Sequence, residues 1–462
     1  MTGATRHGGD SSRRVVITGM GWVTPLGFDV DQVWARLLAG ESAVGPVSHF
    51  PAGTFTTNFA AQVREFNLSR FLADAASHKD AHRNSQYALA AAALAWQRAG
   101  LGDPSRAGQA HTGFPALDLD RVGIYLGAGE GILDFENYVA ANLGGWDGAA
   151  RRLDDKRWAG IALDRMSAEC ELEQEPHMPL SHIARALGVR GPAYNTLTAC
   201  AASTQATGEA FEIIRRGDAD VMIAGGAHTM IHPLGVTGFI RLTALSPRRD
   251  EPQRASRPFD ATRNGFVMGE GAGMLILETL EHAKARGAAP LAEVVGYGSS
   301  ADAYRITDIQ PGGMGAVASM KQALDESGID PLGADSAGRP LVHYISAHGT
   351  GTKENDSIES HAVKSVFGER AKAIPMSSIK SMMGHLIAAA GAVELITCVQ
   401  SILTGFLPPT INLNTPDPEC DLDYVPNQAR DERPRGGVEV AMSNSFGFGG
   451  QNDTIIVRRW KG

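Results

Sequence analysis

Three residues in this chain could together carry out acyl-transfer chemistry: one cysteine and two histidines. Cys200 lies in NTLTACAAST, between an apolar stretch and a run of small residues. The segment after it, AASTQATGEAFEIIRRG, has no proline and ends with Arg215, Arg216 and Gly217, which predicts a helix. Cys200 would then lie at a helix N-terminus, where partial positive charge favours the nucleophilic thiolate. A free cysteine is more often a buried structural residue, so this pattern alone leaves both interpretations open.

The two histidines lie in Gly-rich segments further along the chain. His348 lies in ISAHGTGTKENDSIE, at the expected end of a strand, and His385 lies in SSIKSMMGHLIAAAGAVE, at the start of an Ala-rich helix. A helix N-terminus disfavours imidazolium, and a neutral imidazole donates through one nitrogen and accepts through the other. Lys380 lies five residues before His385. A lone histidine usually has only a structural role, but two beside a candidate nucleophile indicate a site.

Two further patterns could complete such a site. Thr350 and Thr352 follow His348 at alternate positions, so their hydroxyls could face one channel. In MSNSFGFGGQND (442–453), Phe446 and Phe448 alternate with glycines, which suits a mobile loop with a bulky gate. Its backbone N–H groups could contribute to an oxyanion hole. The alternative is a tight turn filled by two core phenylalanines.

Composition excludes several other classes. The chain has 462 residues, 43% hydrophobic and 20% charged, with a net charge of −9, which disfavours nucleic-acid binding. Its four cysteines form no CxxC pair, which argues against a zinc site or a disulfide framework and suits a reducing cytosol. GAGEG and GEGAG are not GxGxxG, so a dinucleotide site is weakly supported. We find no apolar run of transmembrane length and no signal peptide, and expect a cytoplasmic protein without membrane contact.

The elements that would position these residues alternate between strands and helices, which predicts an α/β fold with buried sheets. The strand and Gly-rich turn of VVITGMGWVTPLG recur in LAEVVGYGSSADA, which indicates two similar halves. We therefore divide the chain into a disordered tail (1–13), an N-terminal half with the nucleophile (14–289) and a C-terminal half with both histidines (290–462). Residues 102–120 look like an insertion, and residues 130–190 show no clean period.

Taken together, these stretches resemble a known family. VVITGMGWVTPLG, TACAASTQATGEAFEIIRRGDADVMIAGG, HGTGTKENDSIE, KSMMGHLIAAAGAVE and NSFGFGGQN follow one another as in β-ketoacyl-[acyl-carrier-protein] synthases of the elongating type II kind, condensing enzymes of the thiolase superfamily. The resemblance implies a thiolase-like fold, with two similar halves in five αβαβα layers, usually in a homodimer.

The resemblance also implies roles for the candidate residues. Cys200 resembles the nucleophile that takes the acyl chain from acyl carrier protein, and His348 and His385 resemble the pair that acts on the malonyl group. Lys380 resembles the lysine that supports the site near His385. No metal or redox cofactor is implied, because the substrate brings its own phosphopantetheine.

The remaining site residues carry over in the same way. Phe448 resembles the gating aromatic, with Phe446 beside it, and its backbone N–H would join that of Cys200 in the oxyanion hole. Thr350 and Thr352 resemble the threonines that contact the phosphopantetheine arm.

Some members of the family bind a monovalent cation close to this site. The residues that correspond here are Glu394, Ser443 and Asn444. The family often has Asn two residues before the first histidine, where this chain has Ser346.

The implied reaction is decarboxylative Claisen condensation of an acyl thioester with malonyl-[acyl-carrier-protein], which gives 3-oxoacyl-[acyl-carrier-protein] and CO2. Fatty-acid elongation is the leading expectation, and type II polyketide or other specialised acyl-chain synthesis is the alternative. We expect Arg248 and Arg249, in SPRRDEPQRASR, to contact the acidic carrier protein, although a solvated loop explains them equally well.

Three other classes compete with a condensing enzyme. A thiolase is expected to have a second catalytic cysteine in the C-terminal Gly-rich loop, which here is NSFGFGG. A non-catalytic chain-length subunit of a polyketide synthase pair would lack the nucleophile. A purely structural protein would leave the cysteine and histidines unexplained, so we rank the condensing enzyme first.

Overall fold

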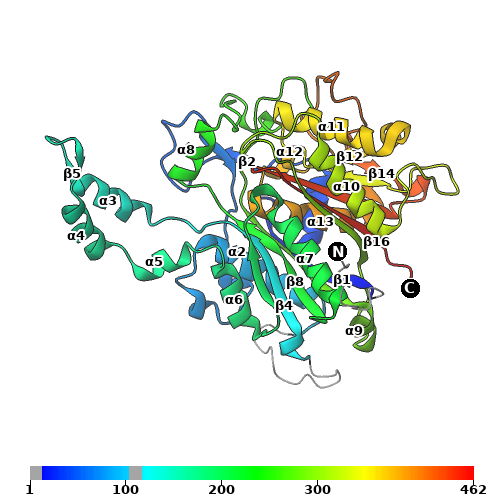
Figure 1. The fold of residues 1–462 in the computed structure, drawn as a ribbon, viewed down its shortest axis with the longest axis horizontal. Helices are drawn as coiled ribbons and strands as arrows, with labels where there is room; N and C mark the ends of the chain where they lie inside the picture. Colours follow the sequence, from blue (N-terminus) through cyan, green and yellow to red (C-terminus); the bar gives the residue numbers. More distant parts are fainter. Residues whose placement is uncertain (1–12, 103–116) are drawn as a thin grey trace, which may run out of the picture.

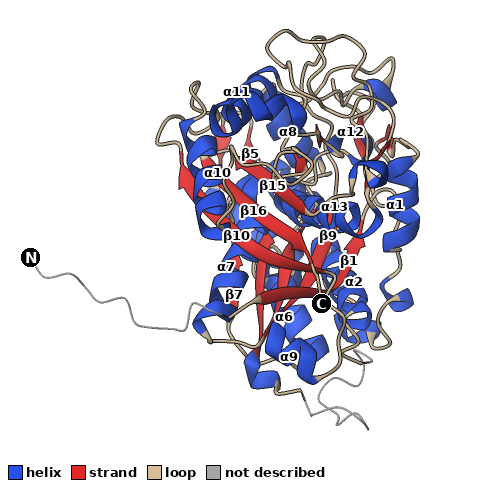
Figure 2. Ribbon diagram, turned by 90° about the vertical axis from the view of Figure 1, so that its right-hand side faces the viewer, coloured by secondary structure: helices blue, strands red, loops and turns tan. Residues whose placement is uncertain are grey.

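The computed structural model describes residues 13–102 and 117–462. The predicted tail (1–13) and the predicted insertion (102–120) lie largely outside these residues. A mixed ten-stranded sheet forms the centre of the fold (Figure 2), in the order β12-β11-β15-β16-β10-β1-β9-β8-β4-β7. Its strands are β1 (Val15–Val23), β4 (Val122–Ala128), β7 (Ala193–Thr196), β8 (Val221–His228), β9 (Gly271–Thr279), β10 (Ala292–Ala301), β11 (Tyr344–Ser346), β12 (Met376–Ser377), β15 (Val440–Gly447) and β16 (Gln451–Arg459).

The two sets of five strands, followed outward from the middle of the sheet, repeat the same order and the same pairing directions. From β1 outward, β9 and β8 are antiparallel to their neighbours, whereas β4 and β7 are parallel. From β10 outward, β16 and β15 are antiparallel, whereas β11 and β12 are parallel. Strands β1 and β10 join these two sets through a short antiparallel pairing, from Val15–Val294 to Ile17–Ala292. The division at residue 290 stays a prediction, which this repeat supports.

Helices cover both faces of each set of strands and fill the space between them. Figure 1 shows α7 (Ala202–Arg216) and α13 (Ala390–Thr404) in the middle of the molecule. On one outer side lie α2 (Arg83–Arg98) and α6 (Met178–Leu187), and on the other lie α10 (Met314–Ser327) and α11 (Lys353–Phe367). This is the five-layer αβαβα arrangement that the resemblance implied.

The other helices and strands surround this frame. They are α1 (Val30–Leu38), α8 (Pro233–Arg241), α9 (Leu280–Ala285) and α12 (Lys380–Met383), with three small antiparallel pairs: β2 (Val44–Pro46) with β3 (Phe59–Ala61), β5 (Trp146–Asp147) with β6 (Arg152–Leu153), and β13 (Phe406–Leu407) with β14 (Arg430–Asp431).

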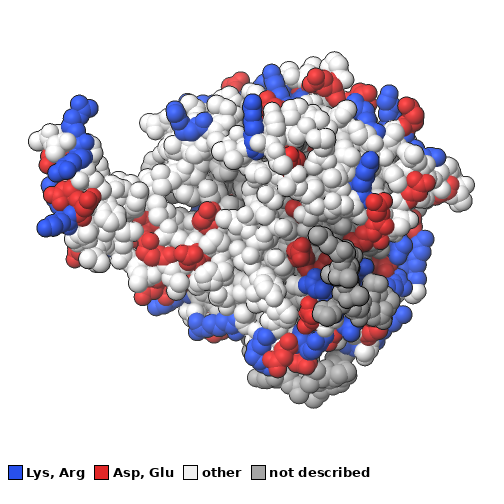
Figure 3. Space-filling model, viewed as in Figure 1, with Lys and Arg blue, Asp and Glu red and all other residues white. Residues whose placement is uncertain are grey.

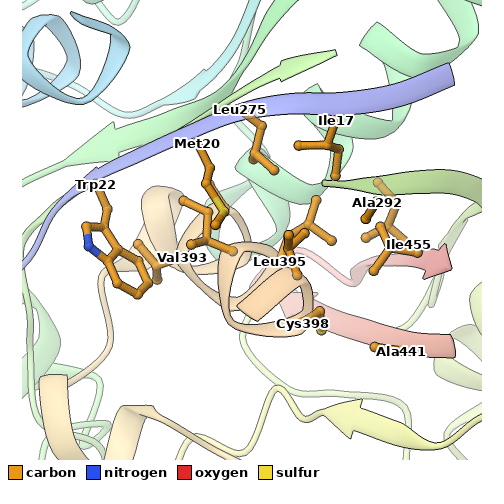
Figure 4. Close-up of a cluster of buried hydrophobic side chains, with 14 of the residues drawn as sticks. Ile17, Met20, Trp22, Leu275, Ala292, Val393, Leu395, Cys398, Ala441 and Ile455 are labelled. Carbon is orange, nitrogen blue, oxygen red and sulfur yellow. The ribbon is translucent and has the colours of Figure 1, made fainter. Parts of the chain in front are cut away.

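The central helix α13 is apolar on all sides because it is buried on all sides. Val393, Leu395 and Cys398 pack among side chains of β1, β9, β15 and β16 (Figure 4). The segment Ile387–Thr404 is long and apolar enough to span a membrane by length and composition, with a mean hydropathy of 1.6. The expectation that no such run exists was therefore wrong. Since 89% of this segment is buried inside the fold, contacts with the two halves of the sheet account for its composition.

An arm leaves the body between β4 and α6 (Figure 1). It consists of α3 (Phe135–Gly145), the β5–β6 hairpin, α4 (Asp155–Arg165) and α5 (Ala168–Glu173). Its two ends meet at the body, where the Gly131 amide donates to the Gln174 carbonyl at 2.9 Å. Acidic side chains gather where the arm joins the body, and both acidic and basic ones lie towards its far end (Figure 3). The arm explains why residues 130–190 show no regular spacing of apolar residues. Its helices bury side chains mainly where α3 packs on α4, so few positions need to be apolar.

The two central helices approach each other closely at Gly391. A Cβ atom at this position would lie 1.9 Å from the Thr204 hydroxyl and 3.0 Å from the Ser445 hydroxyl, which are bonded to each other at 2.7 Å. The absence of a side chain therefore sets the separation of α7 and α13.

We expect Gly391→Ala to lower the free energy of unfolding by about 1–3 kcal/mol, because the methyl group overpacks this contact. Urea unfolding followed by tryptophan fluorescence measures the change. Gly238→Ala in α8, where a Cβ meets nothing within 4 Å, is the matched control and should be neutral or slightly stabilising. Equal losses in both variants would contradict the argument.

Candidate active site

Cys200 lies in the turn that leads from β7 into α7. A short 3-10 turn, Ala199–Ala201, precedes the helix, which ends at Gly217 in the left-handed conformation. The predicted helix and its terminus are confirmed. Ala199 has a φ of +48°, a conformation that costs a non-glycine residue about 1–3 kcal/mol. This turn places Cys200, only 6% exposed, between the body of the fold and a cavity.

The structure brings the three candidate reactive residues together, although His348 and His385 are distant from Cys200 in sequence. The Cys200 sulfur and one ring nitrogen from each histidine lie within 4.8 Å of one another. The two imidazole rings are edge-to-face, with centroids 5.5 Å apart. His348 follows the end of β11, and His385 precedes the turn into α13, as the sequence predicted.

A backbone amide fixes the tautomer of His385. Its Nδ1 accepts the Ile387 N–H at 3.2 Å, so the ring proton lies on Nε2. That Nε2 is buried and has no partner among the described residues. Ile387 has a φ of +50°, so this turn is held in a conformation that a non-glycine residue rarely adopts. His385 can therefore donate a hydrogen bond to a bound group.

A sulfur and two imidazoles at this spacing could also ligate a divalent metal. The Nε2 proton of His385 opposes this, since a ligating nitrogen needs its lone pair free.

The histidines are neutral, and so is the cysteine. Burial lowers the pKa of both His348 and His385 well below the usual value, and the Lys380 ammonium lowers it further. Burial raises the pKa of the Cys200 thiol to about 11, although Lys380 and the backbone amides of Phe448 and Cys200 act in the opposite direction. The helix N-terminus favours the thiolate, as the sequence indicated, but loss of hydration has the larger effect on the pKa of Cys200. Acylation of Cys200 requires a group that takes its proton.

Lys380 connects the two histidine segments. Its ammonium donates to the His348 carbonyl at 2.6 Å and forms an ion pair with Glu394 inside the protein. Burial raises the pKa of Glu394 to about 7, against the opposing effect of Lys380. Removing one member of such a pair leaves an uncompensated buried charge, so Lys380 and Glu394 act as a unit.

Glu359 also positions His348, and the sequence analysis missed it. Its carboxylate accepts the His348 and Gly349 N–H groups, both at 2.9 Å. Burial raises its pKa to about 7. The only sequence signal was its place on the buried face of α11, which does not reveal what it contacts.

The Gly-rich loop approaches the nucleophile from the β15–β16 hairpin. A Cβ on Gly447 would lie 2.8 Å from the Thr198 carbonyl and 3.3 Å from the Cys200 amide, so only glycine allows this approach. Phe446 is buried, and its ring lies 5.7 Å from that of His348. Phe448 is half-buried and packs beside Cys200.

A cavity of about 410 Å³ connects these residues with the surface. Thr350 and Thr352 line it, with their hydroxyls 3.0 Å apart. Arg248 and Arg249 are not among its lining residues. Arg248 pairs with Glu251 at 3.6 Å, and Arg249 donates to the Gly53 carbonyl at 3.4 Å. Both lie in the segment that follows the cavity wall at Thr243 and Ala244.

Several buried oxygen atoms lie where the family's cation was expected. Glu394 Oε2, Ser443 Oγ and Ser346 Oγ have no partner among the described residues, and Ser346 is paired with Ser443 on adjacent strands. Asn444 is already bonded to Glu359 and Thr454. Unpartnered oxygens are the kind of ligand that a hard cation prefers.

Comparison with known proteins identifies the family. Residues 12–283 match the beta-ketoacyl synthase N-terminal domain, and residues 291–414 match the beta-ketoacyl synthase C-terminal domain. The chain therefore belongs to the β-ketoacyl synthase family, as its motifs predicted. It is a condensing enzyme with the thiolase-like fold.

Individual relatives match over nearly the whole chain. A protein from Synechocystis sp. named 3-oxoacyl-[acyl-carrier-protein] synthase 2 is 40% identical over 454 residues, and one of the same name from Coxiella burnetii is 39% identical over 449. Each match covers 97% of this chain and 99% of the relative. Among solved structures, the type II polyketide ketosynthase AntDE, in complex with its acyl carrier protein, has a TM-score of 0.80 at 34% identity, covering 97% of this chain and 100% of its own.

We expect alkylation of Cys200 by iodoacetamide to accelerate about tenfold per pH unit between pH 7 and 9, because the thiolate fraction rises with pH towards the pKa of about 11. Intact-protein mass spectrometry measures the rate, and Cys200→Ala reports labelling of the other cysteines. A rate that stays constant over this range would indicate a thiolate already formed at neutral pH.

Proposed function

We propose that this chain condenses an acyl group held on Cys200 with malonyl-[acyl-carrier-protein], as in fatty-acid chain elongation. The observation that carries the proposal is the cluster of a buried thiol and two neutral imidazoles within 4.8 Å, one with its Nε2 proton fixed. Neutral imidazoles are suited to donating hydrogen bonds to a developing oxyanion.

In the first half-reaction, the Cys200 sulfur attacks the acyl thioester and the pantetheine thiol leaves. The Cys200 proton passes through a neighbouring imidazole to the departing sulfur, so no net charge remains. The backbone N–H groups of Cys200 and Phe448 would stabilise the tetrahedral oxyanion.

In the second half-reaction, the malonyl thioester loses CO2 as its carbon–carbon bond breaks. The electron pair moves onto the thioester oxygen, which accepts hydrogen bonds from His348 and His385. The resulting carbanion attacks acyl-Cys200, and the sulfur leaves as a thiolate. The thiolate takes up one proton from solvent, which balances the negative charge left when the malonyl carboxylate departs as neutral CO2. Lys380 supports this step by fixing the His348 backbone. Phe448, with Phe446 behind it, would gate entry of the second substrate.

The pathway assignment rests on the relatives. Those named 3-oxoacyl-[acyl-carrier-protein] synthase 2 are 39–40% identical, compared with 34% for the polyketide ketosynthase AntDE. Polyketide synthesis is the second candidate, favoured by full-length similarity to AntDE. A thiolase is disfavoured because the 446–450 loop contains no cysteine.

The partners follow from this reaction. Acyl carrier protein would deliver both substrates on phosphopantetheine, with Thr350 and Thr352 along the arm and Arg248 and Arg249 at the docking surface. No further cofactor is needed, and the oxygens of Glu394 and Ser443 would hold a monovalent cation that steadies the histidine segments. We place the enzyme in the cytoplasm.

A homodimer is part of the same proposal. Strand β7 is at one end of the sheet, and its Tyr194 side chain is 52% exposed. An uncovered edge strand favours pairing with another strand. The arm next to it exposes large apolar side chains, namely Leu143, Trp146, Leu163 and Leu172. A second copy paired along β7 would cover this surface.

Cys200→Ala should abolish condensation and prevent acylation, while decarboxylation of malonyl-[acyl-carrier-protein] continues, since both histidines remain. His385→Ala should lose decarboxylation by at least about 100-fold, because it removes a donor to the enolate oxygen. Intact-protein mass spectrometry with a panel of acyl carrier protein thioesters measures acylation, and CO2 release measures decarboxylation. Full condensation by Cys200→Ala would exclude the proposed nucleophile. The preferred acyl group distinguishes fatty-acid from polyketide synthesis.

Charge reversal of Arg248 and Arg249 to Glu should raise the KM for the carrier protein about 5- to 10-fold at low salt, with little change in kcat. Charges at the protein surface mainly affect the rate at which the carrier protein and the enzyme associate. The matched control is Arg433→Glu, which reverses an exposed arginine outside the cavity lining. An unchanged KM at low ionic strength would show that this loop is merely solvated.

A further inference from the structure

Asn355 has a buried amide oxygen without a hydrogen-bond partner, and it lines the cavity that leads to Cys200. The residue is 3% exposed. Its Oδ1 has no partner among the described residues. An unpaired buried acceptor costs free energy, so such an atom usually has a partner that arrives from outside the chain.

The other end of the amide is held in place, which fixes where the oxygen points. Asn355 Nδ2 donates to Asp356 Oδ1 at 3.1 Å. Asp356 is fully buried and accepts the Phe259 and Gly351 N–H groups at 2.8 and 3.2 Å, with the Arg263 guanidinium 3.5 Å away. A carboxylate surrounded by donors selects the NH2 end of Asn355 and turns Oδ1 away from it.

The cavity wall also contains the hydroxyls of Thr350 and Thr352. Thr350 and Thr352 are bonded to each other, so one hydroxyl proton is used between them and one is free to donate. Asn355, in the first turn of α11, adds an acceptor to this donor. Lys353, Glu354 and Asp308 line the same cavity.

We infer that Asn355 is a substrate-binding residue whose Oδ1 accepts a hydrogen bond from an amide N–H of the pantetheine arm. The inference rests on the proposed function, which brings this arm into the cavity. Pantetheine contains two secondary amides, and each N–H must find an acceptor when it leaves water. The side-chain oxygen Oδ1 of Asn355 supplies one acceptor at a fixed place. It would therefore set how deeply the pantetheine arm enters the cavity towards Cys200.

The test uses the full-length enzyme and acyl-pantetheine thioesters in which one amide N–H at a time is replaced by an ester oxygen. Wild type should lose about tenfold in kcat/KM for acylation of Cys200 with one of the two esters, mainly through KM. Asn355→Ala should be about tenfold slower than wild type with the parent amide, yet indifferent to the same replacement. Ser357→Ala, on the same helix but outside the cavity lining, should behave like wild type.

Other results would overturn the inference in distinguishable ways. If wild type tolerates both ester substrates, Oδ1 bonds to water and not to the arm, whether or not Asn355→Ala folds. If Asn355→Ala and wild type lose the same factor on ester replacement, another residue accepts the N–H. If wild type is not acylated by the parent amide at Cys200, the proposed function itself fails, and the inference falls with it.

Discussion

The approach of the two central helices determines whether this site can exist. The turns that begin helices α7 and α13 contact each other, and Gly391 allows the helices to touch through Thr204. Each begins with a 3-10 turn that contains a residue at positive φ, Ala199 before Cys200 and Ile387 after His385. Because both strained turns lie against this contact, the nucleophile from one half faces the imidazole from the other. If α7 and α13 lay further apart, Cys200 and His385 would be at two separate helix N-termini and would not face each other.

Burial then sets the charge state of everything at that meeting point. Burial pushes the thiol, both imidazoles and the carboxyl groups of Glu359 and Glu394 towards their neutral forms, although the Lys380 ammonium opposes this effect at Glu394. Where the nearby side chains are neutral, fixed N–H donors are the means of stabilising a transient oxyanion. The same burial makes proton transfer from Cys200 a necessary part of acylation.

The sequence was sufficient to single out the residues that the structure brings together, because each lies in a recognisable local pattern, and the resemblance of several motifs to one family implied the five-layer architecture. Cys200, His348 and His385 each lie in a Gly-rich turn between a strand and a helix, and the recurring strand pattern indicated two halves. The protonation state of Cys200 could not be predicted in this way, because it depends on how completely other segments exclude water. Glu359 and Asn355 were missed for a related reason: their contacts depend on how α11 packs, which periodicity does not show.

The arm could not be foreseen either, since its helices have little shared interior and hence no regular apolar period. Its attachment has a consequence for how such enzymes diversify. Because Gly131 and Gln174 are hydrogen-bonded to each other, the segment between them leaves the body of the fold and returns to the same place. Segments of different length can be exchanged at this junction without shifting a single strand register. The outer contacts of the enzyme can therefore change while the residues around Cys200 keep their positions.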